Sequence, residues 1–121
     1  FRQQEMTHIM ENIFFNELMI RECSVDIGIV YSTGKNAKGK VTPVARAIDF
    51  IASSGGKKTY IQSAYALGTE EKAITENKRF VLTGDSFPKI IVRHDIRKRW
   101  NDDNGILNIS VIDFLLDDTL V

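Results

Sequence analysis

Apolar positions follow two different periods along this chain, and the change of period predicts a mixed α/β fold. Near the N-terminus the apolar side chains recur every three to four residues, so we expect an amphipathic helix over roughly residues 5–22. Within residues 25–31 they recur at every second position, which predicts a strand. Residues 32–43 are polar and contain two glycines and a proline, so a loop is expected there.

Two strands separated by a glycine turn are the clearest prediction. Residues 44–52 and 58–65 both have strand character, and Gly55-Gly56 lies between them. A two-residue hairpin turn of this kind needs positive φ at both central positions, which glycine adopts readily. The turn sets an antiparallel register in which Ile51 is expected opposite Tyr60.

The same register brings an acid and an amide together. Asp49 is expected opposite Gln62, and Ala47 opposite Ala64. Because side chains alternate along a strand, Asp49, Gln62 and Ala64 are expected on one face of the sheet. In a metal-dependent nuclease, an acid on one strand faces an acid and a lysine two residues apart on the next. Here the amide replaces the second acid and the alanine replaces the lysine.

The C-terminal half predicts a helix and two further strands. Thr69 is expected to cap a helix that ends near Gly84. Residues 89–93 predict a short buried strand, residues 95–105 a charged loop, and residues 106–111 a last strand.

A short helix is expected at the C-terminal end, because Ser110 and Asp113 have the spacing of a capping box. The predicted order is therefore helix, three strands, helix, strand, strand and short helix. We expect a single α/β domain over residues 1–121, with an antiparallel three-strand meander in a mixed sheet flanked by helices.

Charge and cysteine content narrow the setting. Lysine and arginine together number 16, as do aspartate and glutamate, so no overall charge draws the chain to nucleic acid or to a membrane. No apolar run approaches the length of a membrane span. Cys23 is the only cysteine, which fits a reducing compartment, and we expect a cytoplasmic location.

Six short segments, taken in order, carry a resemblance to a known family. They are His8-Ile9-Met10-Glu11-Asn12, Ile48-Asp49-Phe50, Tyr60-Ile61-Gln62 with Ala64-Tyr65, Glu70-Glu71, Phe87-Pro88-Lys89 and Ile112-Asp113-Phe114-Leu115-Leu116. In these segments the chain resembles the C-terminal domain of unknown function that follows the ATPase core in a family of prokaryotic AAA-type ATP-binding proteins.

The resemblance implies a restriction-endonuclease-like, PD-(D/E)xK fold with an α-β-β-β-α-β core. It implies that residues 1–121 are a C-terminal fragment of a longer ATPase. The ATPase core of the same chain is then the expected partner, and ATP and Mg²⁺ are expected only in that core.

Departures from the nuclease pattern lead us to expect a vestigial site. Nuclease-competent members of the wider superfamily carry glutamate at the position of Gln62 and lysine at that of Ala64. Phosphodiester hydrolysis of this kind needs carboxylates that hold a divalent cation, and Asp49 and Glu11 are the acids expected to remain. Glu17 also falls among the apolar positions of the expected helix, so either Glu17 or Glu11 is the acid expected to face the sheet. We expect no catalytic residue, metal or cofactor in this domain, and a binding or regulatory role.

Two basic stretches are candidates for nucleic-acid contact, since basic residues interleaved with an aromatic hold phosphates and stack a base. They are Lys35, Lys38 and Lys40, and Arg97, Lys98, Arg99 and Trp100. The zero net charge and the adjoining Asp102-Asp103 favour weak contact at most.

Two alternative functions remain open from the sequence. One is an active metal-dependent nuclease whose lysine comes from elsewhere, with Lys57 or Lys58 near in sequence. The other is a domain for dimerisation or for recognition of a protein partner. The sequence names neither the partner nor the oligomeric state.

Overall fold

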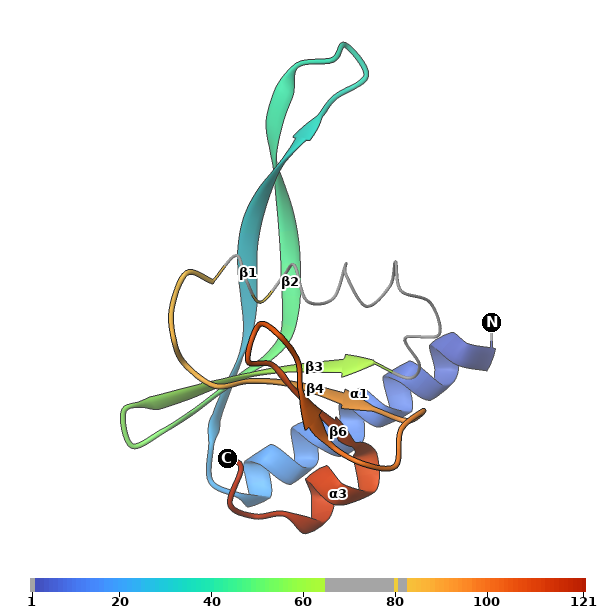
Figure 1. Cartoon of the computed structure of the whole chain (residues 1–121), viewed down its shortest axis with the longest axis vertical. Helices are drawn as coiled ribbons and strands as arrows, with labels where there is room; N and C mark the ends of the chain where they lie inside the picture. Colours follow the sequence, from blue (N-terminus) through green and yellow to red (C-terminus); the bar gives the residue numbers. More distant parts are fainter. Residues whose placement is uncertain (1, 65–79, 81–82) are drawn as a thin grey trace.

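A six-stranded mixed sheet forms the centre of the protein in the computed structural model (Figure 1). The structure describes residues 2–64, 80 and 83–121. Within them lie α1 (Arg2–Ile20), β1 (Ser24–Lys35), β2 (Val41–Ser54), β3 (Lys57–Ala64), β4 (Lys89–Arg93), β5 (Trp100–Asn101), β6 (Leu107–Ser110) and α3 (Val111–Leu116). The helix expected from Thr69 onward falls outside the described part of the chain.

The strand order is β1-β2-β3-β4-β6-β5. β1, β2 and β3 form the expected antiparallel meander, β4 and β6 join in parallel, and β5 is antiparallel to β6. The chain is therefore a small α/β domain with a mixed sheet. In the described part of the chain, no helix is both long and apolar enough to cross a bilayer.

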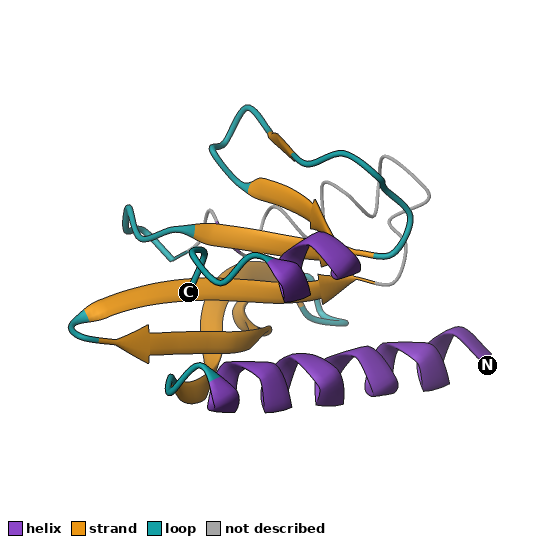
Figure 2. Ribbon diagram, turned by 90° about the horizontal axis from the view of Figure 1, so that it is seen from below, coloured by secondary structure: helices purple, strands orange, loops and turns teal. Residues whose placement is uncertain are grey.

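Both described helices pack on one face of the sheet, and α1 runs along it (Figure 2). Met10, Phe14 and Leu18 are the buried side of α1, one helical turn apart. Ile9 and Ile13 also follow the spacing of three to four residues from which the helix was expected, but they are 49% and 42% exposed. The buried stripe of α1 is therefore narrower than the sequence pattern suggests.

The central strand β4 has apolar side chains on both faces, as expected for a buried parallel strand. Ile90 and Val92 belong to the cluster beneath α1 and α3, whereas Ile91 belongs to a second cluster on the opposite face. The second cluster also contains Ile48, Tyr60, Ala64, Phe80 and Ile106.

Arg21, which directly follows α1, connects α1 to α3 through hydrogen bonds. Its guanidinium donates to the backbone carbonyls of Phe114 (2.9 Å), Leu115 (3.3 Å) and Asp117 (3.1 Å). It also donates to the Glu17 carboxylate at 3.1 Å and lies 5.2 Å from the centroid of the Phe114 ring. Arg21 thus satisfies carbonyls at the end of α3 that the helix itself leaves without partners.

The prediction of a loop over residues 32–43 is wrong, because β1 and β2 continue through most of this segment. β1 and β2 remain paired as far as Lys35 opposite Val41, which leaves only a turn between them. Asn36 closes this turn: its Oδ1 accepts the backbone N–H of Lys38 at 2.9 Å and of Lys40 at 3.0 Å. Figure 1 shows the hairpin projecting well beyond the other strands.

A β-bulge marks the point where this projection begins. Asp26 pairs with Ile51 and Gly28 pairs with Ile48, so two residues of β2 lie opposite Ile27. Below, the arm means the hairpin beyond the bulge, residues 28–48.

The bulge turns Ile48 and Ile51 toward the same cluster, although they are three residues apart. Gly28 lies against both. A Cβ atom on Gly28 would meet Ile51 Cδ1 at 2.7 Å and Ile48 Cβ at 3.3 Å. Glycine at this position therefore makes room for the two isoleucines that the bulge brings together.

The second hairpin and the C-terminal cap agree with expectation. Gly55 and Gly56 have φ of 58° and 80°, and Ile51 pairs with Tyr60. The Ser110 hydroxyl accepts the Asp113 N–H at 3.1 Å, which caps α3. The charged segment 95–105, expected as a loop, also contains the two-residue strand β5.

Candidate functional site

The β2–β3 ladder gives way to side-chain hydrogen bonds at Asp49 and Gln62. The last paired residues in the ladder are Phe50 and Ile61. Beyond them, the Asp49 backbone N–H donates to Gln62 Oε1 at 3.2 Å, and the Ser63 N–H donates to Asp49 Oδ2 at 2.9 Å. Each of the two side chains therefore bonds a backbone amide of the other strand, which satisfies groups that the ladder no longer pairs.

Asp49 and Glu11, two of the predicted site residues, line one groove of about 600 Å³. The groove lies between α1 and the start of the first hairpin, and its other lining residues are Asn12, Phe15, Val25, Asp26, Ile27 and Phe50. Glu11 is partly exposed, with His8 Nδ1 4.0 Å from its carboxylate. Glu17 pairs with Arg21 instead, so Glu11 is the helix acid beside Asp49.

The expectation that Asp49, Gln62 and Ala64 share one face rested on unbroken alternation along β2, and the bulge breaks it. Gln62 lies between Tyr60 and Ala64, which both pack in the cluster on the face away from α1. Asp49 lines the groove beside α1. The predicted proximity of Asp49 and Gln62 is confirmed by their hydrogen bond, but the reasoning from alternation was wrong.

At this site the Asp49 carboxylate and the Gln62 side-chain carbonyl each accept a hydrogen bond from a backbone N–H group. Gln62 is 4% exposed, and its neutral carbonyl adds no charge for a cation. Ala64 is 8% exposed and contributes only to apolar packing. Among the described residues, no three or more His, Cys, Asp or Glu side chains gather where they would hold a metal ion.

Ser63 is a polar residue of this region that the sequence reasoning missed. Ser63 is 6% exposed, and its hydroxyl has no hydrogen-bond partner among the described residues. Its backbone N–H is the donor to Asp49. The only signal in the sequence is its place directly after Gln62. Because side chains were expected to alternate along the strand, Ser63 was expected on the face away from Asp49 and Gln62 and was not considered.

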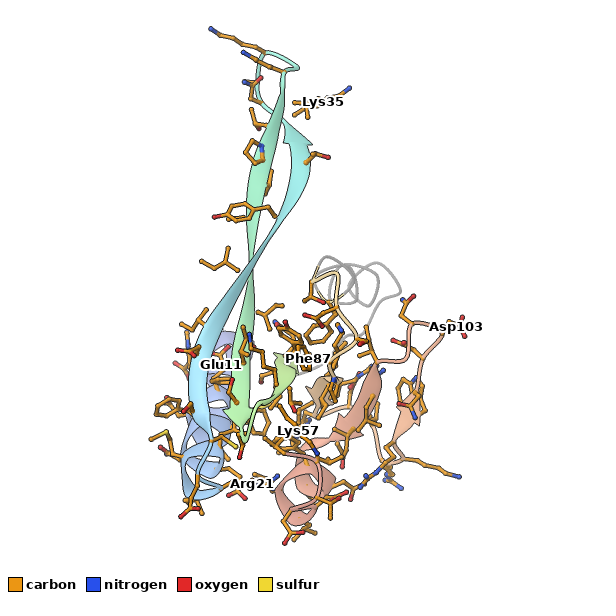
Figure 3. The ribbon with its side chains drawn as sticks, turned by 90° about the vertical axis from the view of Figure 1, so that its left-hand side faces the viewer. Glu11, Arg21, Lys35, Lys57, Phe87 and Asp103 are labelled. Carbon is orange, nitrogen blue, oxygen red and sulfur yellow. The ribbon has the colours of Figure 1, made fainter. Side chains whose placement is uncertain are left out.

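The lysines of the first basic stretch lie at the tip of the arm. Lys35, Lys38 and Lys40 are exposed there, and the turn that carries two of them is held by Asn36. Figure 3 shows Lys35 near the far end of the hairpin, distant from Glu11 and Arg21 in the body. The structure therefore separates this stretch from the Asp49 groove.

The second basic stretch is partly neutralised by local partners. Arg99 donates to the Asp117 carboxylate at 2.9 Å, and the Arg93 guanidinium lies 5.3 Å from the centroid of the Trp100 ring. Hydrogen bonds from Thr119, together with Arg99, lower the pKa of Asp117 to about 2. Arg97 and Lys98 are exposed. Trp100 therefore already has the cation of an arginine of its own chain over its ring.

A polar cluster of Tyr60, Asp85 and Lys89 lies where β4 begins beside β3. The Tyr60 hydroxyl donates to Asp85 Oδ2 at 2.5 Å, and Lys89 Nζ donates to Asp85 Oδ1 at 3.2 Å. Burial, the Asp85 hydrogen bond and the Asp85 charge raise the pKa of Tyr60 to about 12. Burial also acts to raise the pKa of Asp85, but hydrogen bonds from Tyr60, Lys89 and the Phe87 N–H outweigh it and lower that pKa.

These shifts predict a loss of stability in alkali. A group whose pKa is higher in the folded state stabilises the fold below its unfolded pKa, near 10 for Tyr60, and this contribution disappears as the pH rises toward 12. Urea unfolding at pH values from about 9 to about 12 should show this decline. Tyr60→Phe should lack that component, and an identical decline in both proteins would contradict the assignment.

The lowered pKa of Asp85 acts in the opposite direction. Its contribution to stability is present above its unfolded pKa of 3.8 and is lost as the pH falls below that value. The cluster is therefore most stabilising at intermediate pH, where Asp85 is ionised and Tyr60 is neutral.

No protein-family model matches this chain, and no curated protein matches it.

Proposed function

We propose that this domain is a catalytically degenerate, nuclease-like module that binds or regulates, and that it acts with an AAA-type ATPase core of its own chain. The restriction-endonuclease-like assignment is part of the proposal. It is supported by the order of α1, the β1–β2–β3 meander and the parallel strand β4. The resemblance in short segments described above supports the ATPase connection.

The observation that carries the proposal is the exchange of hydrogen bonds between Asp49 and Gln62. A nuclease site of this type needs carboxylate oxygens that turn toward a cation, and a lysine close to the phosphate. Here the Asp49 carboxylate accepts a backbone N–H, the neutral Gln62 accepts another, and Ala64 is packed among apolar side chains. These residues stabilise the junction of two strands, which is a structural use of the positions.

The partner in this proposal is protein. Contact of Lys35, Lys38 and Lys40 with nucleic acid is expected to be weak, since the chain carries 16 basic and 16 acidic residues. The reading frame that encodes the chain tests the ATPase connection: a Walker motif upstream supports it, and an unrelated upstream sequence would contradict it.

A cleavage assay combined with unfolding tests the role of Asp49. The domain should leave single- and double-stranded DNA and RNA intact in Mg²⁺ or Mn²⁺. Asp49→Ala should lower the free energy of unfolding by about 2 kcal/mol, because the Ser63 N–H loses its acceptor. Asp49→Asn keeps an acceptor oxygen and should lose less than about 1 kcal/mol.

Asp26→Ala is the matched control. Asp26 is also an acid that lines the groove, but it is exposed, so its loss should change stability by less than about 0.5 kcal/mol. Metal-dependent cleavage that disappears in Asp49→Ala would mean that the site is active and that the proposal is wrong. Equal stability of Asp49→Ala and Asp26→Ala would remove the structural role of the carboxylate.

A further inference from the structure

β1 forms one edge of the sheet along all of its 12 residues. Its neighbour on one side is β2, and no strand of the described residues lies on the other side. An edge strand presents backbone N–H and C=O groups that can pair with a further strand. Figure 1 shows the arm projecting beyond the other strands, and along the arm no strand of the described residues other than β2 pairs with this edge.

The edge carries a row of exposed apolar side chains. Ile27, Ile29 and Tyr31 are 73%, 59% and 65% exposed, and their spacing of two places them on one face of β1. Isolated apolar residues on a surface are ordinary, but a contiguous row marks an interaction surface. Natural edge strands are usually protected by charge or proline, and residues 27–34 contain neither.

Charge is distributed unequally between the two ends of β1. The acids Glu22 and Asp26 lie at the end near the body, whereas Lys35, Lys38 and Lys40 lie at the tip, and all five are exposed. Two such strands side by side in antiparallel orientation bring the acidic end of each beside the basic end of the other. A parallel arrangement would bring like charges together.

We propose that the occupant of this edge is a second copy of the same chain, with the two β1 strands paired antiparallel about a twofold axis near residue 30. Ile29 then lies opposite Tyr31 of the partner subunit, a β-branched and aromatic pair of the kind that stabilises sheets. The contact is closed by its symmetry, so it produces a dimer and leaves no free edge at β1. This inference stands independently of the role assigned to Asp49.

The test is the mass of the chain in solution. Sedimentation equilibrium across micromolar concentrations should give twice the monomer mass of 13.7 kDa. Ile29→Lys combined with Tyr31→Lys places lysines opposite each other twice across the axis. It should raise the dissociation constant at least about 100-fold, because two apolar pairs become two like-charged pairs.

The matched control is Ile112→Lys on α3. Ile112 is also apolar and 68% exposed, but it lies far from β1 in the sequence and on another element, so this variant should remain dimeric. Both variants change exposed side chains, and circular dichroism with thermal unfolding should show an intact fold in each.

Each outcome bears on the proposal. Loss of the dimer in the β1 variant alone supports it. A monomer at every concentration overturns it and assigns the apolar face to a different protein partner. A dimer that survives the β1 substitutions, or that is lost in Ile112→Lys, also overturns it, because the copies then meet through another surface.

Discussion

Replacement of Arg21 with alanine is expected to lower the free energy of unfolding by about 3 kcal/mol. The Arg21 side chain is 8% exposed and bonds three backbone carbonyls at the end of α3 as well as the Glu17 carboxylate. Alanine leaves these partly buried acceptors without their donor, and it removes the cation from the Phe114 ring. Urea unfolding followed by circular dichroism measures the loss.

Two further substitutions separate the shape of the side chain from its charge. Arg21→Lys keeps the charge but has no planar fork to reach several carbonyls, so its loss should be intermediate. Arg99→Ala removes an arginine that is 41% exposed and pairs with Asp117. It should lose less than about 1 kcal/mol. If Arg21→Ala and Arg99→Ala were equally mild, the attachment of α3 to α1 through Arg21 would not be important for stability.

Gly28→Val should also destabilise the protein by about 3 kcal/mol, because a Cβ at this position would press against Ile51 and against the buried Ile48. The closest atom of Ile51 would lie 2.7 Å from the new Cβ, and Ile48, which is fully buried, would lie 3.3 Å away. The measurement is again urea unfolding.

A double variant shows whether crowding is the cause. Gly28→Val with Ile51→Ala should be more stable than the sum of the two single losses predicts, by at least about 1 kcal/mol. Gly34→Val is the control, since a Cβ at Gly34 would meet one atom, Val44 Cγ2, also at 2.7 Å and on a half-buried side chain, whereas a Cβ at Gly28 would meet both Ile51 and Ile48. Additive losses in the double variant would mean that steric contact with Ile51 is not the reason.

The elements predicted well from the sequence are those set by local chemistry. Gly55 and Gly56 form the expected turn because few other residues adopt positive φ at both positions. Ser110 caps α3 because its hydroxyl reaches the Asp113 N–H three residues ahead. β4 matches the prediction because a run buried on both faces is apolar throughout.

The arm and the bulge were not predictable in the same way. Polar residues with glycine and proline usually indicate a loop, but the two strands of a projecting hairpin have solvent on both faces and need no apolar alternation. A bulge adds one residue to one of two paired strands, and this bulge contains no residue type that would indicate it in the sequence. Phe50 and Asp49 together oppose Ile27, and nothing in their identities announces it.

For the candidate site, the sequence predicted the neighbours but not their bonds. The Gly55-Gly56 turn sufficed to bring Asp49 near Gln62. The bond between the Asp49 carboxylate and the Ser63 N–H depends on where the ladder ends, and that point follows from the bulge. The choice of Glu11 over Glu17 depends on Arg21 and α3, which lie almost a hundred residues apart in sequence.

The position of β6 and α3 also has a consequence for synthesis on the ribosome. The cluster beneath α1 contains Ile109 and Phe114 alongside Phe14, and the rings of Phe14 and Phe114 meet edge to face at 5.5 Å. The two hairpins can form while the chain is emerging, but this cluster closes only after residue 114 has left the exit tunnel. Folding of the domain is therefore expected only after residue 114 has emerged, and until then Phe14 and Leu18 remain open to chaperones.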